Sequence, residues 1–139
     1  MQTMQQSTMK KLSPVIMVDA IEACIPFWER LGFAKTTEVP EGDRLGFVIL
    51  VKDNVEVMYQ THESVQKDAG GLVPRAHGHG AGFFIEVSDI ESVVRALEGV
   101  DVVVPRRKTF YGMDEIGVRE PGGHVVMFAQ PTADWPRMG

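Results

Sequence analysis

Apolar and polar residues alternate along this 139-residue chain in a pattern that predicts short strands and a few amphipathic helices. Residues 14–18 form an apolar run of strand length. The stretch from residue 19 to residue 31 has the i, i+3, i+4, i+7 spacing of one helix face, with apolar residues at Ile21, Cys24, Ile25 and Trp28. Gly32 ends this predicted helix, and Pro26 within it predicts a bend or a loosened first half.

Two β-rich runs follow this helix and predict a hairpin. They cover residues 46–51 and 55–60, and three polar residues separate them. A polar, glycine-rich linker is then predicted at 62–80. Beyond it the pattern predicts a strand, a helix and three further strands, at 83–87, 88–97, 100–104, 115–119 and 124–129. The segment 120–123, Glu-Pro-Gly-Gly, predicts a turn between the last two strands.

The two halves of the chain repeat at a constant offset of 69 residues. Ile21–Glu22 falls on Ile90–Glu91, and far downstream Val57–Tyr59 falls on Val126–Phe128. Because one offset fits both a helix start and a final strand, we expect two copies of a β-α-β-β-β unit that together form one compact domain. The predicted order is a flexible arm, a first module, a linker, a second module and a tail, at residues 1–11, 12–61, 62–80, 81–131 and 132–139.

Composition narrows the classes of partner. The chain carries 14 Lys and Arg against 19 Asp and Glu, a formal charge of −5, which disfavours nucleic acid and anionic membranes and would favour a cationic small molecule. A single cysteine, Cys24, excludes an internal disulfide framework and a cysteine-cluster metal site. No apolar run approaches the roughly 18 residues of a membrane helix, and no signal-peptide pattern opens the chain. A cytoplasmic location is therefore expected.

Three groups of motifs carry a family resemblance. They are Val-Asp-Ala-Ile-Glu at 18–22 with Phe-Trp-Glu-Arg-Leu-Gly-Phe at 27–33, Val-Ser-Asp-Ile-Glu at 87–91, and Tyr-Gly-Met-Asp-Glu at 111–115 followed by Arg-Glu-Pro-Gly-Gly-His at 119–124. Over roughly residues 12 to 130, their order and spacing resemble the vicinal oxygen chelate superfamily. Glyoxalases, bleomycin-resistance proteins, extradiol dioxygenases and fosfomycin-resistance enzymes belong to it. The resemblance implies an α+β fold in which two tandem β-α-β-β-β modules form a cupped mixed sheet around a central cavity. It also implies a homodimer with ligand grooves between the subunits.

The resemblance also places the metal ligands of the metal-dependent members, which are mostly His and Glu. Carried onto this chain, the four positions hold Ser13, Met58, Gly82 and Met127. Divalent metals of this class bind imidazole nitrogen or carboxylate oxygen, which these four residues do not offer. The comparison therefore predicts that the family's metal site is absent.

Two alternatives could restore a metal site. Strand alternation puts Glu56 and Glu86 on the same predicted sheet face as the lost ligand positions, where they could hold a metal together with a histidine. His77 and His79 are a second pair, although the glycines around them indicate a linker. Cys24 lies on the apolar face of the first helix and is expected to be a buried core residue.

The same strand alternation, with the four ligand positions as its reference, predicts the residues that line the cavity. This lining is aromatic and rich in methionine. We expect nine ligand-binding residues: Met17, Glu56, Met58, Phe84, Glu86, Tyr111, Glu115, Arg119 and Met127. The three glutamates favour a cationic or hydrogen-bonding ligand group. The arginine offers either an anchor for an anionic ligand group or a partner for an ion pair within the protein. The residues on the opposite face of these strands are aliphatic, which suits packing under the helices. The alternative is that the methionines and Phe84 only fill core volume.

These features favour a metal-free small-molecule-binding protein that resembles the bleomycin-resistance members, has no cofactor, and acts by sequestering a drug or metabolite. The alternative is a glyoxalase- or dioxygenase-like lyase, isomerase or oxygenase with a rebuilt metal site. A third hypothesis is metal-free acid–base catalysis, with Glu56 or Glu86 as the base and Tyr111 assisting. It requires a carboxylate whose pKa is raised by burial.

Overall fold

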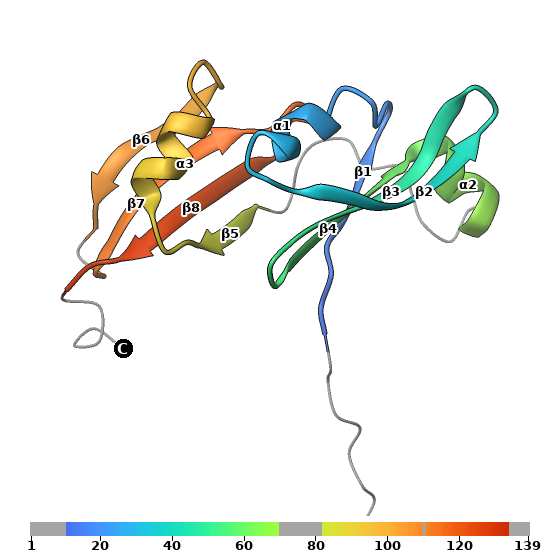
Figure 1. Ribbon diagram of the computed structural model, residues 1–139. Coiled ribbons are helices and arrows are strands. Elements are labelled where there is room, and N and C mark those ends of the chain that lie inside the picture. The colour runs from blue at the N-terminus through green and yellow to red at the C-terminus, as the bar shows by residue number, and fades with distance from the viewer. Residues whose placement is uncertain (1–10, 70–81, 110, 134–139) are drawn as a thin grey trace, which may run out of the picture.

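The computed structural model describes residues 11–69, 82–109 and 111–133, which form two four-stranded mixed sheets with three short helices (Figure 1). The first module contains β1 (Val15–Val18), α1 (Ile25–Glu29), β2 (Ala34–Glu41), β3 (Arg44–Lys52), β4 (Val55–Thr61) and α2 (His62–Ala69). The second contains β5 (Phe83–Glu86), α3 (Ile90–Ala96), β6 (Val102–Lys108), β7 (Met113–Arg119) and β8 (Val125–Pro131). The strand orders are β1-β4-β3-β2 and β5-β8-β7-β6. The predicted α+β class with two β-α-β-β-β modules is confirmed.

The predicted repeat is visible in the strand pairing. In the first sheet β1 pairs in parallel with β4, and Val15 lies opposite Met58. In the second sheet β5 pairs in parallel with β8, and Phe84 lies opposite Met127. Both residues of the second pair stand 69 positions after those of the first, so the offset holds at the level of register.

One core serves both modules, and the aliphatic face of each sheet packs into it. Ile16 and Val18 of the first sheet, with Val118 and Val126 of the second, are at most 5% exposed and belong to one apolar cluster. Trp28 of α1, which is 1% exposed, joins that cluster, and α1 lies between the two sheets in Figure 1. The predicted packing of the aliphatic phase is therefore confirmed, and the opposite phase of each sheet points away from this core.

The first helix is shorter than the apolar spacing predicts. It was expected to run to residue 31 from residue 19 or 20, but α1 begins at Ile25, with Pro26 in its first turn. Proline fits that position because its missing N–H has no helical partner there, whereas deeper in a helix it would break a hydrogen bond. The preceding segment is a turn closed by the Cys24 N–H on the Ile21 carbonyl at 2.8 Å. Ile21 and Cys24 are nevertheless buried, because a turn can present two apolar side chains to the core as well as a helix can.

Two elements were not anticipated from the pattern. The strand β2 exposes all its side chains from Ala34 to Pro40, so it has no apolar alternation to reveal it. The helix α2 occupies the first eight residues of the segment that we expected to be a linker. Its start is capped by Thr61, whose hydroxyl accepts a hydrogen bond from the Ser64 N–H at 3.1 Å.

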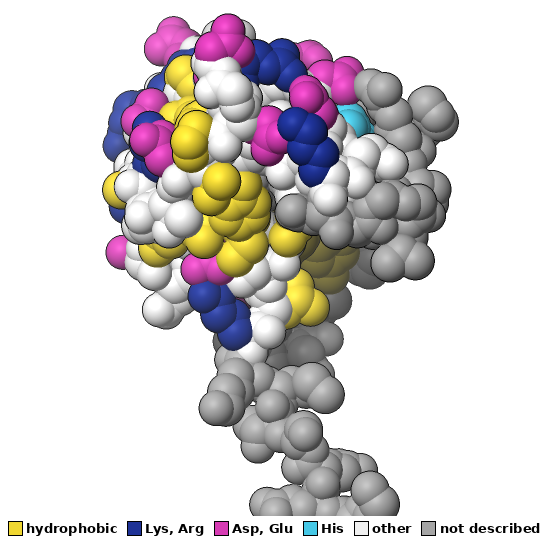
Figure 2. Space-filling view, turned by 90° about the vertical axis from the view of Figure 1, so that its right-hand side faces the viewer, with side chains coloured by type: hydrophobic (Ala, Val, Ile, Leu, Met, Phe, Trp, Pro, Cys, Tyr) yellow, Lys and Arg dark blue, Asp and Glu magenta, His cyan; other side chains and the backbone are white. Residues whose placement is uncertain are grey.

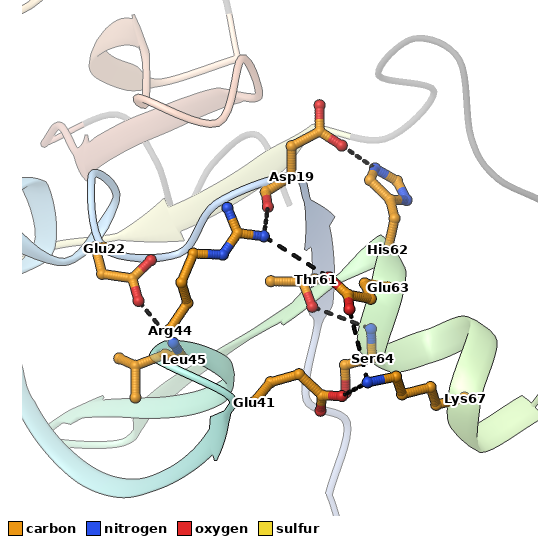
Figure 3. A network of polar contacts seen from close by, with 10 residues as sticks. All are labelled: Asp19, Glu22, Glu41, Arg44, Leu45, Thr61, His62, Glu63, Ser64 and Lys67. Atoms are coloured by element: carbon orange, nitrogen blue, oxygen red, sulfur yellow. Dashed lines mark hydrogen bonds and ion pairs between the residues drawn. The ribbon is translucent and has the colours of Figure 1, made fainter.

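A polar network holds α2 against the first sheet (Figure 3). Lys67, in its last turn, forms an ion pair with Glu41 at the end of β2, and also lies 3.6 Å from Glu63 one turn earlier. Arg44 of β3 approaches Glu63 at 3.9 Å and the Asp19 carbonyl oxygen at 3.5 Å. Charged surface contacts, not an apolar stripe, thus accompany this helix, which explains why apolar periodicity did not predict it.

The second module follows the predicted pattern more closely. Asp89 caps α3 through the Ser92 N–H at 3.4 Å, and the predicted turn is closed by the Gly123 N–H on the Glu120 carbonyl at 2.8 Å. The strand expected at 100–104 lies two residues later and runs to Lys108. The strand β7 begins two residues before the expected position, at Met113.

Some predicted segments lie outside the described residues. They include the arm except Lys11, most of the linker, and residues 134–139 of the tail. None of the helices formed by the described part of the chain has the length and apolar character that a membrane crossing requires.

Candidate functional site

Most of the predicted cavity residues lie on the sheet faces that point away from the shared core. In the second sheet a β-carbon built on Gly117 would lie 2.5 Å from the Met127 Sδ and 2.9 Å from the Val104 Cβ, so these residues share one face. Phe84 is paired with Met127 across the parallel register and is 55% exposed. This face is therefore an open apolar surface rather than filled core volume.

The first sheet presents a similar surface. Met58 of β4 lies between Val15 of β1 and Ile49 of β3, and Met17 follows on the same face. Val15 is 45% exposed, and both methionines are half-buried. Figure 2 views the side of the molecule that carries this sheet, and hydrophobic side chains gather in the middle of it, with charged ones mostly above. Flexible thioethers and aliphatic groups make such a surface adaptable to the shape of an apolar ligand.

Two predicted residues, Tyr111 and Glu115, contact each other at one end of the second sheet. The Glu115 carboxylate is only 1% exposed and accepts a hydrogen bond from the Tyr111 hydroxyl at 2.8 Å through Oε1. Its other oxygen accepts two hydrogen bonds from Arg107, from Nε at 3.1 Å and from Nη2 at 2.9 Å. Both oxygens are thus engaged, as a buried carboxylate requires.

Arg107 was not among the predicted site residues. It stands opposite Glu115 in the β6–β7 register and is 56% exposed. Its hydrogen bonds to Glu115 hold the pKa of the guanidinium above its usual value, so it is a permanent cation on this face. Its neighbour Arg106 turns to the other face, where it pairs with Asp114 at 3.0 Å and with Glu91 of α3 at 2.8 Å. Alternation counted from Val104 would have placed Arg106, not Arg107, on this face, because the β6–β7 register shifts between Val104 and Arg107.

Glu56 has partners of its own. Its carboxylate accepts hydrogen bonds from the Lys11 Nζ at 2.7 Å and the Ser13 hydroxyl at 2.9 Å, which lower its pKa below the usual value. A base for acid–base catalysis needs a raised pKa, so this shift weakens the hypothesis that assigns the base to Glu56. Glu86, on the edge strand β5, is exposed, and it pairs with Ala129 of β8.

Arg119 lies at the far end of the second sheet. Its guanidinium donates to the Gly123 carbonyl oxygen at 3.0 Å and approaches Asp101 at 3.5 Å. These contacts fix the β7–β8 turn and the start of β6, and the pairing with Asp101 agrees with the ion-pair alternative for this residue.

The residues at the family's ligand positions do not fit a divalent metal. Register places Met58 and Met127 in the middle of the two sheet faces, and a thioether is a poor ligand for the metals that this family uses. The hydroxyl of Ser13 is engaged by Glu56, and Gly82 has no side chain. Residues 11–69, 82–109 and 111–133 hold no group of three or more His, Cys, Asp or Glu side chains suited to a metal. His77 and His79 lie outside the described residues.

Cys24 is a core residue, as predicted, with 1% of its surface exposed. Burial raises the pKa of its thiol to about 12, and the charge of Glu120 adds to the effect. A thiol of this kind is protonated at neutral pH, and therefore it is a poor nucleophile.

A buried polar chain that the sequence did not reveal joins the two modules. The Trp28 indole N–H donates to the Tyr59 hydroxyl at 2.8 Å, and that hydroxyl donates to the Glu120 carboxylate at 2.5 Å. Glu120 also accepts from the Gly122 N–H at 2.9 Å and from the backbone N–H of His124 at 2.6 Å. Burial and the charge of Glu120 raise the pKa of Tyr59, so its hydroxyl remains a donor.

A groove of about 880 Å³ also lies between the modules. The end of α1, the β3–β4 turn and the start of α3 form its walls, and the aromatic rings of Phe33 and Phe128 contribute to its lining. Of the predicted ligand-binding residues, Glu86 alone is among its lining residues. The groove is therefore distinct from the two open sheet faces.

Comparisons with known proteins agree on the fold. Residues 11–128 match the model of the Glyoxalase/Bleomycin resistance protein/Dioxygenase superfamily. The structure is similar to TioX from Micromonospora sp. ML1, with 21% identity over 88% of this chain and 98% of that one and a TM-score of 0.69. A glyoxalase/bleomycin resistance protein/dioxygenase family enzyme from Burkholderia phytofirmans PsJN is similar at 15% identity, 86% and 96% coverage and a TM-score of 0.70.

Lactoylglutathione lyase from Agrobacterium tumefaciens is also similar, at 18% identity over 90% of this chain and 96% of that one, with a TM-score of 0.65. At such identities the likeness concerns the fold alone. Among curated proteins, none matches this sequence. The family match covers most of the chain and agrees with the strand order and the repeat. The chain therefore belongs to the glyoxalase/bleomycin resistance protein/dioxygenase superfamily.

Proposed function

We propose that this protein binds an apolar, ring-bearing small molecule on its open sheet faces and that it does so without a metal ion. The observation that carries the proposal is the nature of the four ligand positions. Two of them hold methionines that stand in the middle of apolar sheet faces, beside Val15 and Phe84, which are 45% and 55% exposed. A surface that replaces metal ligands with thioethers suits hydrophobic capture rather than electrophilic activation of a substrate.

A second copy of the chain would complete the site. The open faces carry a row of exposed or half-buried apolar residues, and a monomeric protein usually covers so much apolar surface. A homodimer in which the face of one protomer opposes a face of its partner would enclose a ligand between them. Sequestration would then depend on affinity and on the amount of protein, as in the proposed drug- or metabolite-binding role.

Binding of a neutral apolar fluorophore, N-phenyl-1-naphthylamine, tests the proposal. We expect the wild-type protein to bind it with enhanced fluorescence, and we expect Phe84→Ser to weaken binding by about tenfold, since a buried aromatic contact contributes about 1.5–3 kcal/mol. Val102→Ser is the matched control, because Val102 is 48% exposed but pairs with Val118, which faces the core. Equal effects of the two substitutions, or no binding by the wild-type protein, would contradict the proposal.

The alternative function, a metal-dependent lyase, isomerase or oxygenase, requires a bound metal ion. It needs Glu56 and Glu86 to hold a metal together with a histidine, whereas Glu56 is already engaged by Lys11 and Ser13. Metal content measured on the purified protein separates the two functions directly.

A further inference from the structure

The open face of the second sheet combines an apolar surface with an arginine, Arg107, that a buried carboxylate holds in place. Phe84, Met127, Gly117 and Val104 form one row across β5, β8, β7 and β6. Glu115 lies two residues before Gly117 on β7, and it pairs with Arg107, which lies three residues after Val104 because the register of β6 shifts between them. Alternation along β7 puts Glu115 on the same face as Gly117, and partners across neighbouring strands share a face, so Arg107 stands at the edge of the apolar surface.

Two of the three carboxylates that were expected to attract a cation already have partners, whereas the third, Glu86, is exposed on the edge strand β5. Glu115 is buried and gives both oxygens to Arg107 and Tyr111, and Glu56 is paired with Lys11 at 2.7 Å. Each oxygen of these two carboxylates already accepts a hydrogen bond, so an incoming cation would have to compete with the existing donor. The guanidinium of Arg107, in contrast, is 56% exposed, and its contact with Glu115 uses Nε and Nη2 but not Nη1.

We propose that the ligand carries an oxyanion, such as a carboxylate, sulfonate or phosphate, that Arg107 binds while the apolar body of the ligand lies on Phe84 and Met127. This inference rests on the proposed function and specifies its ligand. A guanidinium offers a planar pair of N–H donors that matches the geometry of an oxyanion. A cation at the border of an apolar surface selects amphipathic anions over neutral molecules of the same shape.

Glu115 and Tyr111 act as positioning residues for this arginine. An arginine on an exposed strand end has many rotamers, and fixing it costs free energy at the moment of binding. The buried carboxylate holds the guanidinium through two hydrogen bonds, and Tyr111 holds the carboxylate in turn at 2.8 Å. Because the arginine is oriented in advance, the ligand does not bear that cost.

A matched pair of fluorophores tests the inference. 8-Anilino-1-naphthalenesulfonate is N-phenyl-1-naphthylamine with one added sulfonate, so the ratio of their dissociation constants isolates the contribution of the anion. We expect the sulfonate to bind the wild-type protein more tightly. We expect Arg107→Gln to weaken its binding by about tenfold, because it removes the charge-assisted hydrogen bonds to the sulfonate.

Binding of the neutral fluorophore to Arg107→Gln should be unchanged. Arg106→Gln is the control, since it removes the same charge from the neighbouring residue, which pairs with Asp114 and Glu91 on the other face. It should leave the sulfonate affinity close to that of the wild-type protein. Arg107→Lys keeps the charge without the planar pair of donors, and we expect an intermediate affinity.

The outcomes separate this inference from the function on which it rests. If both fluorophores bind equally, or if Arg106→Gln and Arg107→Gln weaken the sulfonate alike, the anion site is wrong while apolar binding stands. If neither fluorophore binds the wild-type protein, the proposed function and the inference both fail.

Discussion

At the scale of single residues, one buried carboxylate links the two modules. Glu120 has no exposed side-chain surface, and it accepts hydrogen bonds from the Tyr59 hydroxyl and from two backbone N–H groups of its own turn. A buried charge is tolerated only when such donors replace water. Since Tyr59 belongs to the first module and Glu120 to the second, this chain of contacts joins the modules through the shared core.

Removing the tyrosine hydroxyl should therefore destabilise the whole protein. Tyr59→Phe leaves the Trp28 N–H without its partner and Glu120 Oε2 with the Gly122 N–H as its one remaining donor, and we expect the free energy of unfolding to fall by about 1–3 kcal/mol in urea denaturation. Glu120→Gln and the double variant complete a cycle. Because the two groups are in direct contact, their effects should not add. Additive effects would show that this hydrogen bond does not couple the modules.

At the scale of elements, apolar periodicity predicted the parts that face the shared core. The strand cores of β1, β3, β4, β5, β7 and β8 and the helix α3 follow from it, whereas the turn before β8 follows from its Glu-Pro-Gly-Gly sequence. Apolar periodicity did not predict the strand β2, because its side chains are exposed. It did not predict α2, because charged contacts accompany that helix. Periodicity records burial, so elements without a buried stripe give no such signal.

The candidate site shows the same limit. The contact between Tyr111 and Glu115 joins two residues that were predicted from phase and from the family motif. Arg107 was missed because the pattern ended the preceding strand at residue 104, before its polar half. A polar hairpin end carries no periodic signal, although its register decides which of two adjacent arginines faces the site.

The β6–β7 hairpin should give the protein a measurable pH dependence. Hydrogen bonds from Arg106 hold the pKa of Asp114 below its usual value, so the folded state binds the proton more weakly than the unfolded state does. This contribution to stability is complete above the ordinary aspartate pKa of about 3.9, and it is lost as the pH falls through the lowered value.

We accordingly expect Asp114→Asn to reduce stability at neutral pH and to flatten the loss of stability between about pH 5 and pH 2. Thermal unfolding followed by circular dichroism across this range measures both effects. Asp101→Asn is a suitable control, since Asp101 is 68% exposed and lies 3.5 Å from Arg119 at the far end of the sheet. An unchanged pH profile in the Asp114 variant would show that the ion pair contributes nothing to folding.

At the scale of the whole molecule, the repeat explains both the core and the open faces. Two modules related by 69 residues share one core, and each leaves its other sheet face accessible. The superfamily places its metal ligands on such faces, and here the corresponding residues are Ser13, Met58, Gly82 and Met127. The central claim is therefore that this chain uses the family's scaffold for ligand binding without the family's metal.

The metal content of the purified protein tests that claim most directly. The protein is saturated in turn with Zn²⁺, Ni²⁺, Mn²⁺ and Fe²⁺, dialysed exhaustively and analysed by mass spectrometry. We predict less than about a tenth of an equivalent per chain for every metal, because the donor set offers no adequate ligands. Close to one equivalent per chain, retained by the wild-type protein and lost on Glu56→Gln or Glu86→Gln, would contradict the claim and favour the metal-dependent enzyme.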